Sequence, residues 1–237
     1  MQWGKWMKKT NIYFWLFMLS PALGYLILQS VVLKLMWNLL PVLGYSDSLS
    51  LGICILLPVV AGGYYMSERG KPKRREVTQG KTGEMSFLII LSGCGLALLT
   101  GFFIKDGIRW EMMSALSVFV SVIVVPINEE IIYRGMVLQR AKEALRPITS
   151  VIISAVMFGV SHGSPKRILM AVFAGIIFGL IAERFGTIWA SIPLHMAVNA
   201  LVLWDRLYNL PILIYVTGGI MALVAVVIMS SELRKKL

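Results

Sequence analysis

Apolar runs of membrane-spanning length constrain this chain more than any other feature of its sequence. A spanning helix needs about 20 predominantly apolar residues. Since lipid offers no hydrogen-bond partners to the backbone, such runs must fold as helices. The sequence therefore predicts an all-α integral membrane protein with about eight transmembrane helices, forming a single polytopic domain over residues 1–237. We expect these helices at roughly 12–40, 51–66, 85–104, 112–134, 147–162, 168–183, 187–203 and 210–230.

Composition and charge distribution agree with a membrane protein. Hydrophobic residues make up 57% of the chain and its mean hydropathy is +0.77, which is too apolar for a soluble domain. The net charge of +11 would suit a nucleic-acid partner, but the basic residues lie between apolar runs rather than along one polar face. We therefore expect a lipid bilayer and no nucleic acid as partner.

The positions of Lys and Arg predict the orientation of the helices. Most of the 23 basic residues fall in the N-terminal segment, in the connections 67–84 and 134–147, and in the C-terminal tail. Such residues stay preferentially on the cytoplasmic side. We expect both termini in the cytoplasm, in a bacterial plasma membrane. The basic run within 67–84 could instead dock on anionic lipid.

Two adjacent carboxylates, Glu129 and Glu130, lie within an apolar run. A charge at the middle of a bilayer costs at least ~2.5 kcal/mol, so such residues are usually buried, paired and functional. The chain has two histidines, and both His162 and His195 lie in or at the end of an apolar run. Sparse polar groups in an apolar bundle tend to converge, which predicts one shared site.

The spacing of the acids separates their roles. Glu130 and Arg134 are four residues apart, with the carboxylate nearer the helix N-terminus, as a helical ion pair prefers. Glu129 points about 100° away round the helix and need not share that pair. A carboxylate is a better proton acceptor where little water surrounds it, as a general base requires. A purely structural role for the Glu130–Arg134 pair stays open.

Two further pairs repeat the one-turn spacing. His195 and Asn199 would present two hydrogen-bond donors on one helix face, and Phe158 would place an apolar wall beside His162. Each of these residues taken alone could equally be a packing or interhelical hydrogen-bonding residue.

Three motifs in order, E-E-x-x-x-R, F-x-x-x-H and H-x-x-x-N, resemble the CPBP family. That family includes CAAX-processing endopeptidases and the bacterial Abi proteins linked to bacteriocin processing and self-immunity. The resemblance covers about residues 112–203, our expected catalytic core. It includes Gly175 and Gly179, whose spacing would also let another helix approach closely. Tyr133 stands where Phe is common in the family, a change that we expect to be harmless.

The resemblance implies an intramembrane endopeptidase that works without a covalent intermediate. Glu129 would activate a water molecule with the help of His162. His195 and Asn199 would form the oxyanion hole, whose donors stabilise the tetrahedral intermediate by ~3 kcal/mol or more. The substrate would be a membrane-associated or lipidated protein or peptide. The residues supporting the site would be Glu130, Arg134 and Phe158.

Other chemistries remain open. Two histidines and a carboxylate could hold zinc, although no H-E-x-x-H helix occurs and the resemblance implies catalysis without a metal; we expect no cofactor. Ser161 adjoins His162, but neighbours on a helix point apart, so a serine nucleophile is not favoured. Cys54 and Cys94 lie inside apolar runs as core residues.

Two functions from other classes also remain open. The Glu and His residues could relay protons in a proton-coupled transporter, although no inverted repeat is visible in the sequence. The chain could also be a non-enzymatic immunity or scaffold protein. The sequence leaves oligomeric state and substrate undetermined.

The expected depths of the site residues conflict. If residue 147 lies at the inner membrane face, His162 lies about 22 Å up its helix, near the outer side of a core of about 30 Å. Glu129 precedes a cytoplasmic basic cluster and should lie deeper toward the inner side. We predict that the two meet because the 147–162 helix ends inside a hydrated cavity.

Overall fold

The computed structural model describes residues 12–68, 93, 95, 114–208, 216–217, 219–224 and 226–228. Every described secondary-structure element is helical, which confirms the predicted all-α class. Most of the expected span 85–104 and parts of the span 210–230 lie outside the described residues.

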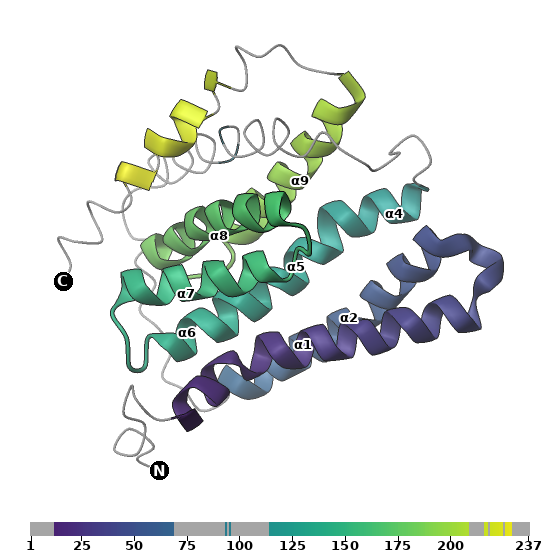
Figure 1. Cartoon of the computed structure of the whole chain (residues 1–237), viewed down its shortest axis with the longest axis horizontal. Helices are drawn as coiled ribbons and strands as arrows, with labels where there is room; N and C mark the ends of the chain where they lie inside the picture. The colour runs from purple at the N-terminus through teal and green to yellow at the C-terminus, as the bar shows by residue number, and fades with distance from the viewer. Residues whose placement is uncertain are drawn as a thin grey trace.

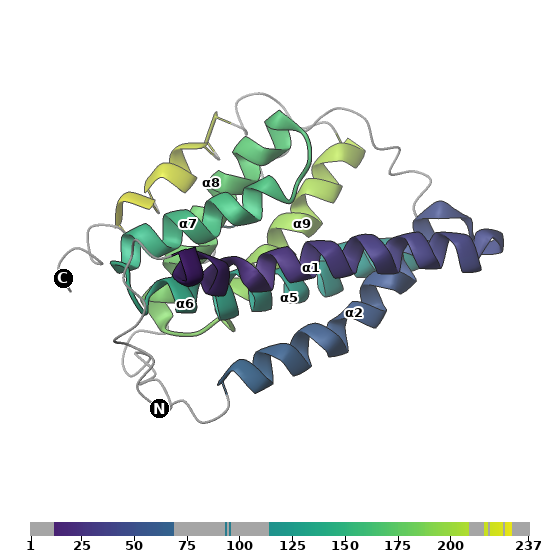
Figure 2. The same cartoon turned by 60° about the horizontal axis from the view of Figure 1, so that its bottom comes forward.

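The chain begins with a helical hairpin. α1 (Ile12–Leu39) is joined to α2 (Gly44–Glu68) by a short 3-10 turn at Pro41–Leu43. Both helices are apolar around most of their circumference, and many of their large hydrophobic side chains are exposed on the protein. In a bilayer these faces would meet lipid. Figures 1 and 2 show this hairpin lying beside the central helix that follows.

The central helix runs from Ala115 to Ala141 and carries the acid pair. It is not a regular α-helix, because two π-helical segments interrupt it. Such π-bulges are rare and occur frequently at functional sites. Its consecutive parts are α4 (Ala115–Phe119), η4 (Val120–Val124, π-helical), α5 (Val125–Glu130), η5 (Ile131–Val137, π-helical) and α6 (Leu138–Ala141).

A second hairpin covers the central helix and consists of α7 (Pro147–Val160) and α8 (Pro165–Phe185) (Figure 1). A Cβ added at Gly175 would lie 2.9 Å from Cα of Ala155, and one at Gly179 would lie 2.9 Å from Cγ1 of Val151. Both glycines therefore let the two helices approach closely, as their spacing predicts.

The last well-described helix is α9 (Ser191–Tyr208), which carries His195 and Asn199. It packs on α5, η4 and α8. His195 contacts residue 130 and Asn199 contacts residue 121, so α9 runs antiparallel to the central helix.

Four described helices are long and apolar enough to cross a membrane: α1, α2, the central helix and α8. Shorter apolar helices occur at Pro147–Val160, Ser191–Leu203 and Gly219–Ile228. The described residues thus establish four candidate spans rather than eight. α7 and the described part of α9 are apolar but fall short of spanning length, because α7 ends at Val160 and the apolar part of α9 ends at Leu203.

Polar contacts at both ends fix the hairpin α1–α2 against the central helix. Asp47, in the first turn of α2, accepts hydrogen bonds from Ser114 and Ser117, the latter at 3.1 Å. At the opposite end, Arg140 donates to the carbonyl oxygen of Phe17 at 2.7 Å. Pro21 has no N–H to donate to that carbonyl four residues earlier, so the arginine satisfies it instead.

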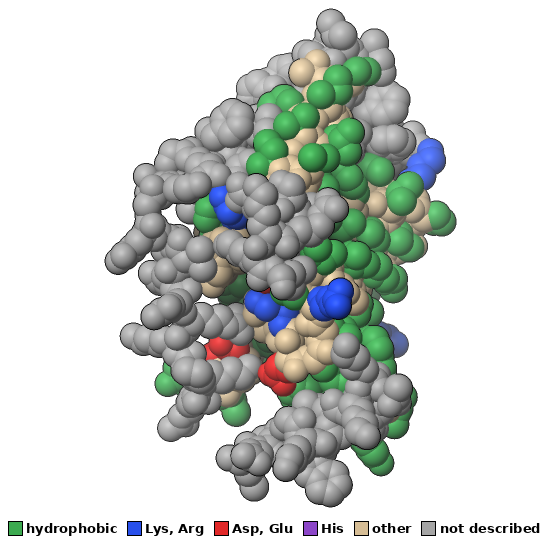
Figure 3. Space-filling model, turned by 90° about the vertical axis from the view of Figure 1, so that its left-hand side faces the viewer, with side chains coloured by type: hydrophobic (Ala, Val, Ile, Leu, Met, Phe, Trp, Pro, Cys, Tyr) green, Lys and Arg blue, Asp and Glu red, His purple; other side chains and the backbone are tan. Residues whose placement is uncertain are grey.

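Charged side chains gather at the end of the molecule that holds the turn between α6 and α7. Lys142 pairs with Glu183 of α8 at 2.6 Å there. Figure 3 faces this end and shows basic and acidic side chains near the middle of the face, with hydrophobic side chains around them. The charged residues of this end include Arg140, Lys142, Glu143, Arg146, Glu183 and Arg184.

Candidate active site

The predicted ion pair between Glu130 and Arg134 is present and lies at the centre of the protein. Nη1 of Arg134 donates to Oε1 of Glu130 at 2.8 Å, and both side chains are fully buried. A buried ion pair is stable only if further hydrogen bonds satisfy both ions. Here Arg134 also donates from Nη2 to the carbonyl oxygen of Gly175 at 3.2 Å.

Aromatic rings enclose the guanidinium of Arg134. Its Cζ lies 4.5 Å from the ring centroid of Phe158 and 5.3 Å from that of Phe178. Cation–π attraction is stronger where water is excluded, as it is in this site. Phe158 therefore packs against the guanidinium of Arg134 as well as against the ring of His162, the contact that its spacing predicts.

His195 lies between the two carboxylates. Its Nδ1 is 3.0 Å from Oε1 of Glu130, and its Nε2 is 3.7 Å from Oε2 of Glu129. Its ring stacks on Phe178 at 4.5 Å and meets Phe158 edge-on at 5.6 Å. Because Glu130 accepts, the Nδ1 position of His195 carries a proton and Nε2 is the atom directed at Glu129.

His162 and Ser161 end helix α7 together. Nδ1 of His162 lies 2.8 Å from the carbonyl oxygen of Phe158, which can only accept, so Nδ1 carries the proton and Nε2 is left with its lone pair. The prediction that Ser161 and His162 point apart is wrong: their side chains are 3.3 Å apart, because α7 ends at Val160. Since Nδ1 of His162 is already protonated, it cannot take a proton from Ser161.

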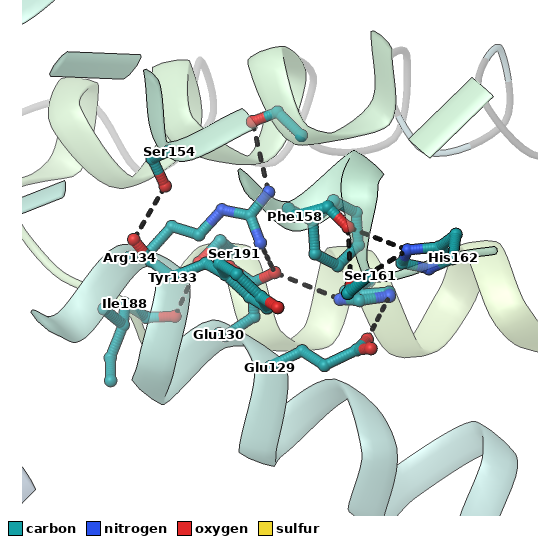
Figure 4. Close-up of polar contacts among 12 residues, drawn as sticks. Glu129, Glu130, Tyr133, Arg134, Ser154, Phe158, Ser161, His162, Ile188 and Ser191 are labelled. Atoms are coloured by element: carbon teal, nitrogen blue, oxygen red, sulfur yellow. Dashed lines mark hydrogen bonds and ion pairs between the residues drawn. The ribbon is translucent and has the colours of Figure 1, made fainter. Parts of the chain in front are cut away.

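His162 reaches the site through Phe158 rather than by direct contact with Glu129. Its ring meets the ring of Phe158 edge-on at 4.7 Å, and Phe158 in turn contacts Tyr133 and His195. No hydrogen bond or ion pair joins His162 to Glu129 within the described part of the chain. Figure 4 shows His162 and Glu129 on the same side of the Glu130–Arg134 pair.

Asn199 satisfies a backbone carbonyl that the central helix leaves unpaired. Val125 donates its N–H to the carbonyl of Val120, a π-helical bond, and the next residue, Pro126, has no N–H for the carbonyl of Ser121. Nδ2 of Asn199 donates to that carbonyl at 2.9 Å. One N–H of the predicted oxyanion donor is therefore used to join α9 to the central helix.

Several residues of the site escaped the sequence analysis. Phe178 stacks on His195, and Ser154 of α7 donates to the carbonyl oxygen of Tyr133 at 2.7 Å, beside the second π-helical segment. Tyr25, buried in α1, lies within electrostatic range of Glu129. Phe178 could have been found from its position next to Gly179, within the motif-rich region; Ser154 and Tyr25 carry no such signal.

A metal ion at this site would need several of the histidine and carboxylate side chains as ligands. His195 is 3.7 Å from Glu129 and is hydrogen-bonded to Glu130, which Arg134 already neutralises. No group of three or more His, Cys, Asp or Glu side chains among the described residues is arranged to hold a metal ion.

Comparison with known proteins places this site in a family. Residues 111–201 match the family of type II CAAX prenyl endopeptidase Rce1-like proteins. The motifs, the buried ion pair and both histidines all lie within this range. Residues 111–201 belong to the CPBP family of membrane proteases. The resemblance read from the three motifs is thereby confirmed.

A bacterial protein is also similar to part of the chain. The chain is 34% identical over 87 residues to "Putative membrane peptidase YdiL" of Bacillus subtilis (strain 168), an alignment that covers 37% of this chain and 36% of that relative. The match thus spans about a third of the relative's length. No solved structure matches the chain. The apolar helices and the family match of residues 111–201 together show an integral membrane protein.

Proposed function

We propose that this protein is an intramembrane endopeptidase that hydrolyses a peptide bond of a membrane-associated or lipidated protein or peptide. The observation that carries the proposal is that the two adjacent carboxylates have different ion-pair partners. Arg134 neutralises Glu130 at 2.8 Å, whereas the one ion-pair partner of Glu129 among the described residues is His195, at 3.7 Å. A carboxylate with no cation bonded to it in a dry site is suited to accept a proton.

In the proposed reaction Glu129 takes a proton from a water molecule, and the resulting hydroxide adds to the scissile carbonyl carbon. The lone pair on Nε2 of His162 orients that water by accepting its second hydrogen. The tetrahedral intermediate then collapses, the C–N bond breaks, and the leaving nitrogen receives the proton that Glu129 holds. No covalent bond to the protein forms.

Charge on the intermediate needs hydrogen-bond donors. In our proposal His195 donates from Nε2 to the oxyanion, while Glu130 accepts from its Nδ1 at 3.0 Å. Asn199 would contribute its second N–H, because its first is bonded to Ser121. Glu130, Arg134 and Phe158 position these groups.

The wider architecture is proposed from the same family resemblance. We propose an eight-helix bundle with a hydrated cavity at the site, both termini in the cytoplasm of a bacterial cell, and a membrane protein or peptide as substrate. Catalysis would need no metal or other cofactor, so a chelator should leave the activity unchanged.

The proposal is tested by comparing membranes that carry the wild-type protein with membranes that carry Glu129→Gln. New peptide N-termini are quantified by mass spectrometry, with and without a chelator, and Glu143→Gln serves as the matched control because Glu143 is exposed and remote from the site. N-termini present with wild type and Glu143→Gln but absent with Glu129→Gln support the protease. Identical N-termini with all three proteins would refute it and favour an immunity or scaffold role.

A further inference from the structure

Tyr133 carries a buried hydroxyl that the fold does not use. The residue is fully buried in η5, and its hydroxyl lies close to the Ser161 side chain without forming a hydrogen bond of normal geometry to any described residue. Buried polar groups in proteins almost always have a partner, so an unsatisfied one requires an explanation. The ring itself is well packed, since it meets Phe158 edge-on at 5.3 Å. A phenylalanine would make that contact equally well.

Tyr133 lies on the same helix face as the proposed base. Tyr133 follows Glu129 by four residues, so the two side chains extend from the same side of the central helix, next to the Glu130–Arg134 pair. The phenol is within electrostatic range of the Glu129 carboxylate. Figure 4 shows Tyr133 within the cluster formed by Glu129, Glu130 and His162.

Three other side chains of the cluster already use one donor each within the protein. Asn199 donates to the carbonyl of Ser121. Nδ1 of His162 donates to the carbonyl of Phe158, and Nδ1 of His195 donates to Glu130. Among the described residues, the hydroxyl of Tyr133 and Nε of Arg134 are buried donors of the cluster without an acceptor, and the arginine is already held by its ion pair with Glu130.

We infer that Tyr133 is a further catalytic residue, whose hydroxyl donates a hydrogen bond to the oxyanion of the tetrahedral intermediate. This inference rests on the proposed function. As the hydroxide adds, the electron pair of the carbonyl double bond moves onto the oxygen, and the phenol O–H donates to that oxygen without being broken. When the intermediate collapses, the pair returns to the carbonyl and the hydrogen bond weakens. The hydroxyl thus acquires in the transition state the partner that it lacks in the free protein.

The test removes only the hydroxyl, by Tyr133→Phe. The matched control is Tyr65→Phe, because Tyr65 is exposed on α2 and distant from the site. The rate of appearance of Glu129-dependent N-termini is measured in membranes and normalised to folded protein, and the thermal midpoint is recorded for each variant. Loss of one oxyanion donor lowers the rate on the order of 100-fold. We expect this loss in Tyr133→Phe with an unchanged thermal midpoint, and a wild-type rate in Tyr65→Phe. This expectation replaces the sequence-based one, in which exchange of Phe and Tyr at position 133 has no effect.

Two results would overturn the inference while leaving the protease intact. One is a Tyr133→Phe rate equal to wild type when Glu129→Gln abolishes cleavage. The other is a loss of rate that is fully accounted for by loss of folded protein, since that would give the hydroxyl a structural role. If no cleavage depends on Glu129, the proposed function itself fails, and the inference fails with it.

Discussion

At the scale of single residues, neighbouring side chains of one type have different environments. Glu129 and Glu130 are adjacent in sequence, yet Glu130 is bonded to both Arg134 and His195, whereas Glu129 has an ion-pair contact with His195 alone within the part of the chain that the structure describes. The helical rotation of about 100° per residue explains the difference, because it directs one carboxylate at the arginine and turns the other away. Substitution of Glu129 should therefore mainly lower activity, whereas substitution of Glu130 should mainly lower stability.

Replacing Glu130 by Gln should destabilise the fold. The substitution leaves Arg134 as an unpaired buried charge and removes the acceptor for Nδ1 of His195. Breaking a buried pair in this way costs about 3–5 kcal/mol. The thermal midpoint of the detergent-purified protein, followed by intrinsic fluorescence, should fall well below that of wild type. Glu143→Gln serves as the control, and an equal midpoint for both variants would contradict the structural role of Glu130.

Replacing Asn199 by Ala should also lower stability, by about 1–3 kcal/mol, because the carbonyl of Ser121 would be left without a donor. The control is Asn38→Ala, which alters an exposed amide in α1. The measurement is the thermal midpoint of both variants. A midpoint for Asn199→Ala that matches the control would show that the bond to Ser121 contributes nothing to the fold.

At the scale of elements, backbone irregularities and close helix contacts bring the site together. The first π-helical segment lies just before Pro126, which has no N–H to donate to the carbonyl of Ser121. That carbonyl instead accepts from Asn199 and so fixes α9 to the central helix. The close packing of α7 on α8 depends on Gly175, whose carbonyl accepts from Arg134. Gly175 thus allows α7 and α8 to pack closely and also accepts a hydrogen bond from the arginine of the ion pair.

Gly175→Ala should therefore destabilise the protein and disturb the site. The new Cβ would lie 2.9 Å from Cα of Ala155 and 3.2 Å from Nη2 of Arg134, and neither the backbone nor the paired guanidinium can move freely. We expect a loss of about 1–3 kcal/mol and reduced cleavage. The control is Gly24→Ala, where nothing lies within 4 Å of the new Cβ; its thermal midpoint should not fall. Equal midpoints for the two variants would argue against close packing at Gly175.

At the scale of the whole molecule, the short length of α7 bears on the proposed cavity. α7 has 14 residues, and its C-terminal turn at Ser161–Ser164 carries His162. A helix of that length rises about 21 Å, which is less than the hydrocarbon thickness of about 30 Å. The turn is therefore expected to end inside the membrane region, where the proposed site needs water.

Water access at this turn can be measured directly. In a background without Cys54 and Cys94, Ser164→Cys should react with a water-soluble maleimide in intact membranes, because Ser164 is exposed at the turn. Ile152→Cys is the matched control: it is 47% exposed on the protein but lies in the middle of α7, where its surroundings would be lipid. Equal, negligible labelling at both positions would contradict a hydrated cavity.

The sequence by itself determined the helical class, the membrane location and the Glu130–Arg134 ion pair. Apolar runs fix helices because the bilayer leaves the backbone no other way to satisfy its hydrogen bonds. The one-turn spacing of Glu130 and Arg134 fixes their ion pair for the same local reason. The number of spans was not determined in this way, since hydropathy does not show that α7 stops at Val160.

Only the tertiary structure decided how the polar groups are shared. His195 could have faced Glu129 alone, but the packing of α9 places it between both carboxylates. Asn199 is bonded to Ser121 because Pro126 and the π-helical segment free that carbonyl, and the unbonded hydroxyl of Tyr133 is evident only when the contacts of every neighbour are known. Hydrogen-bond partners across helices depend on rotation and register, which sequence spacing within one helix does not specify.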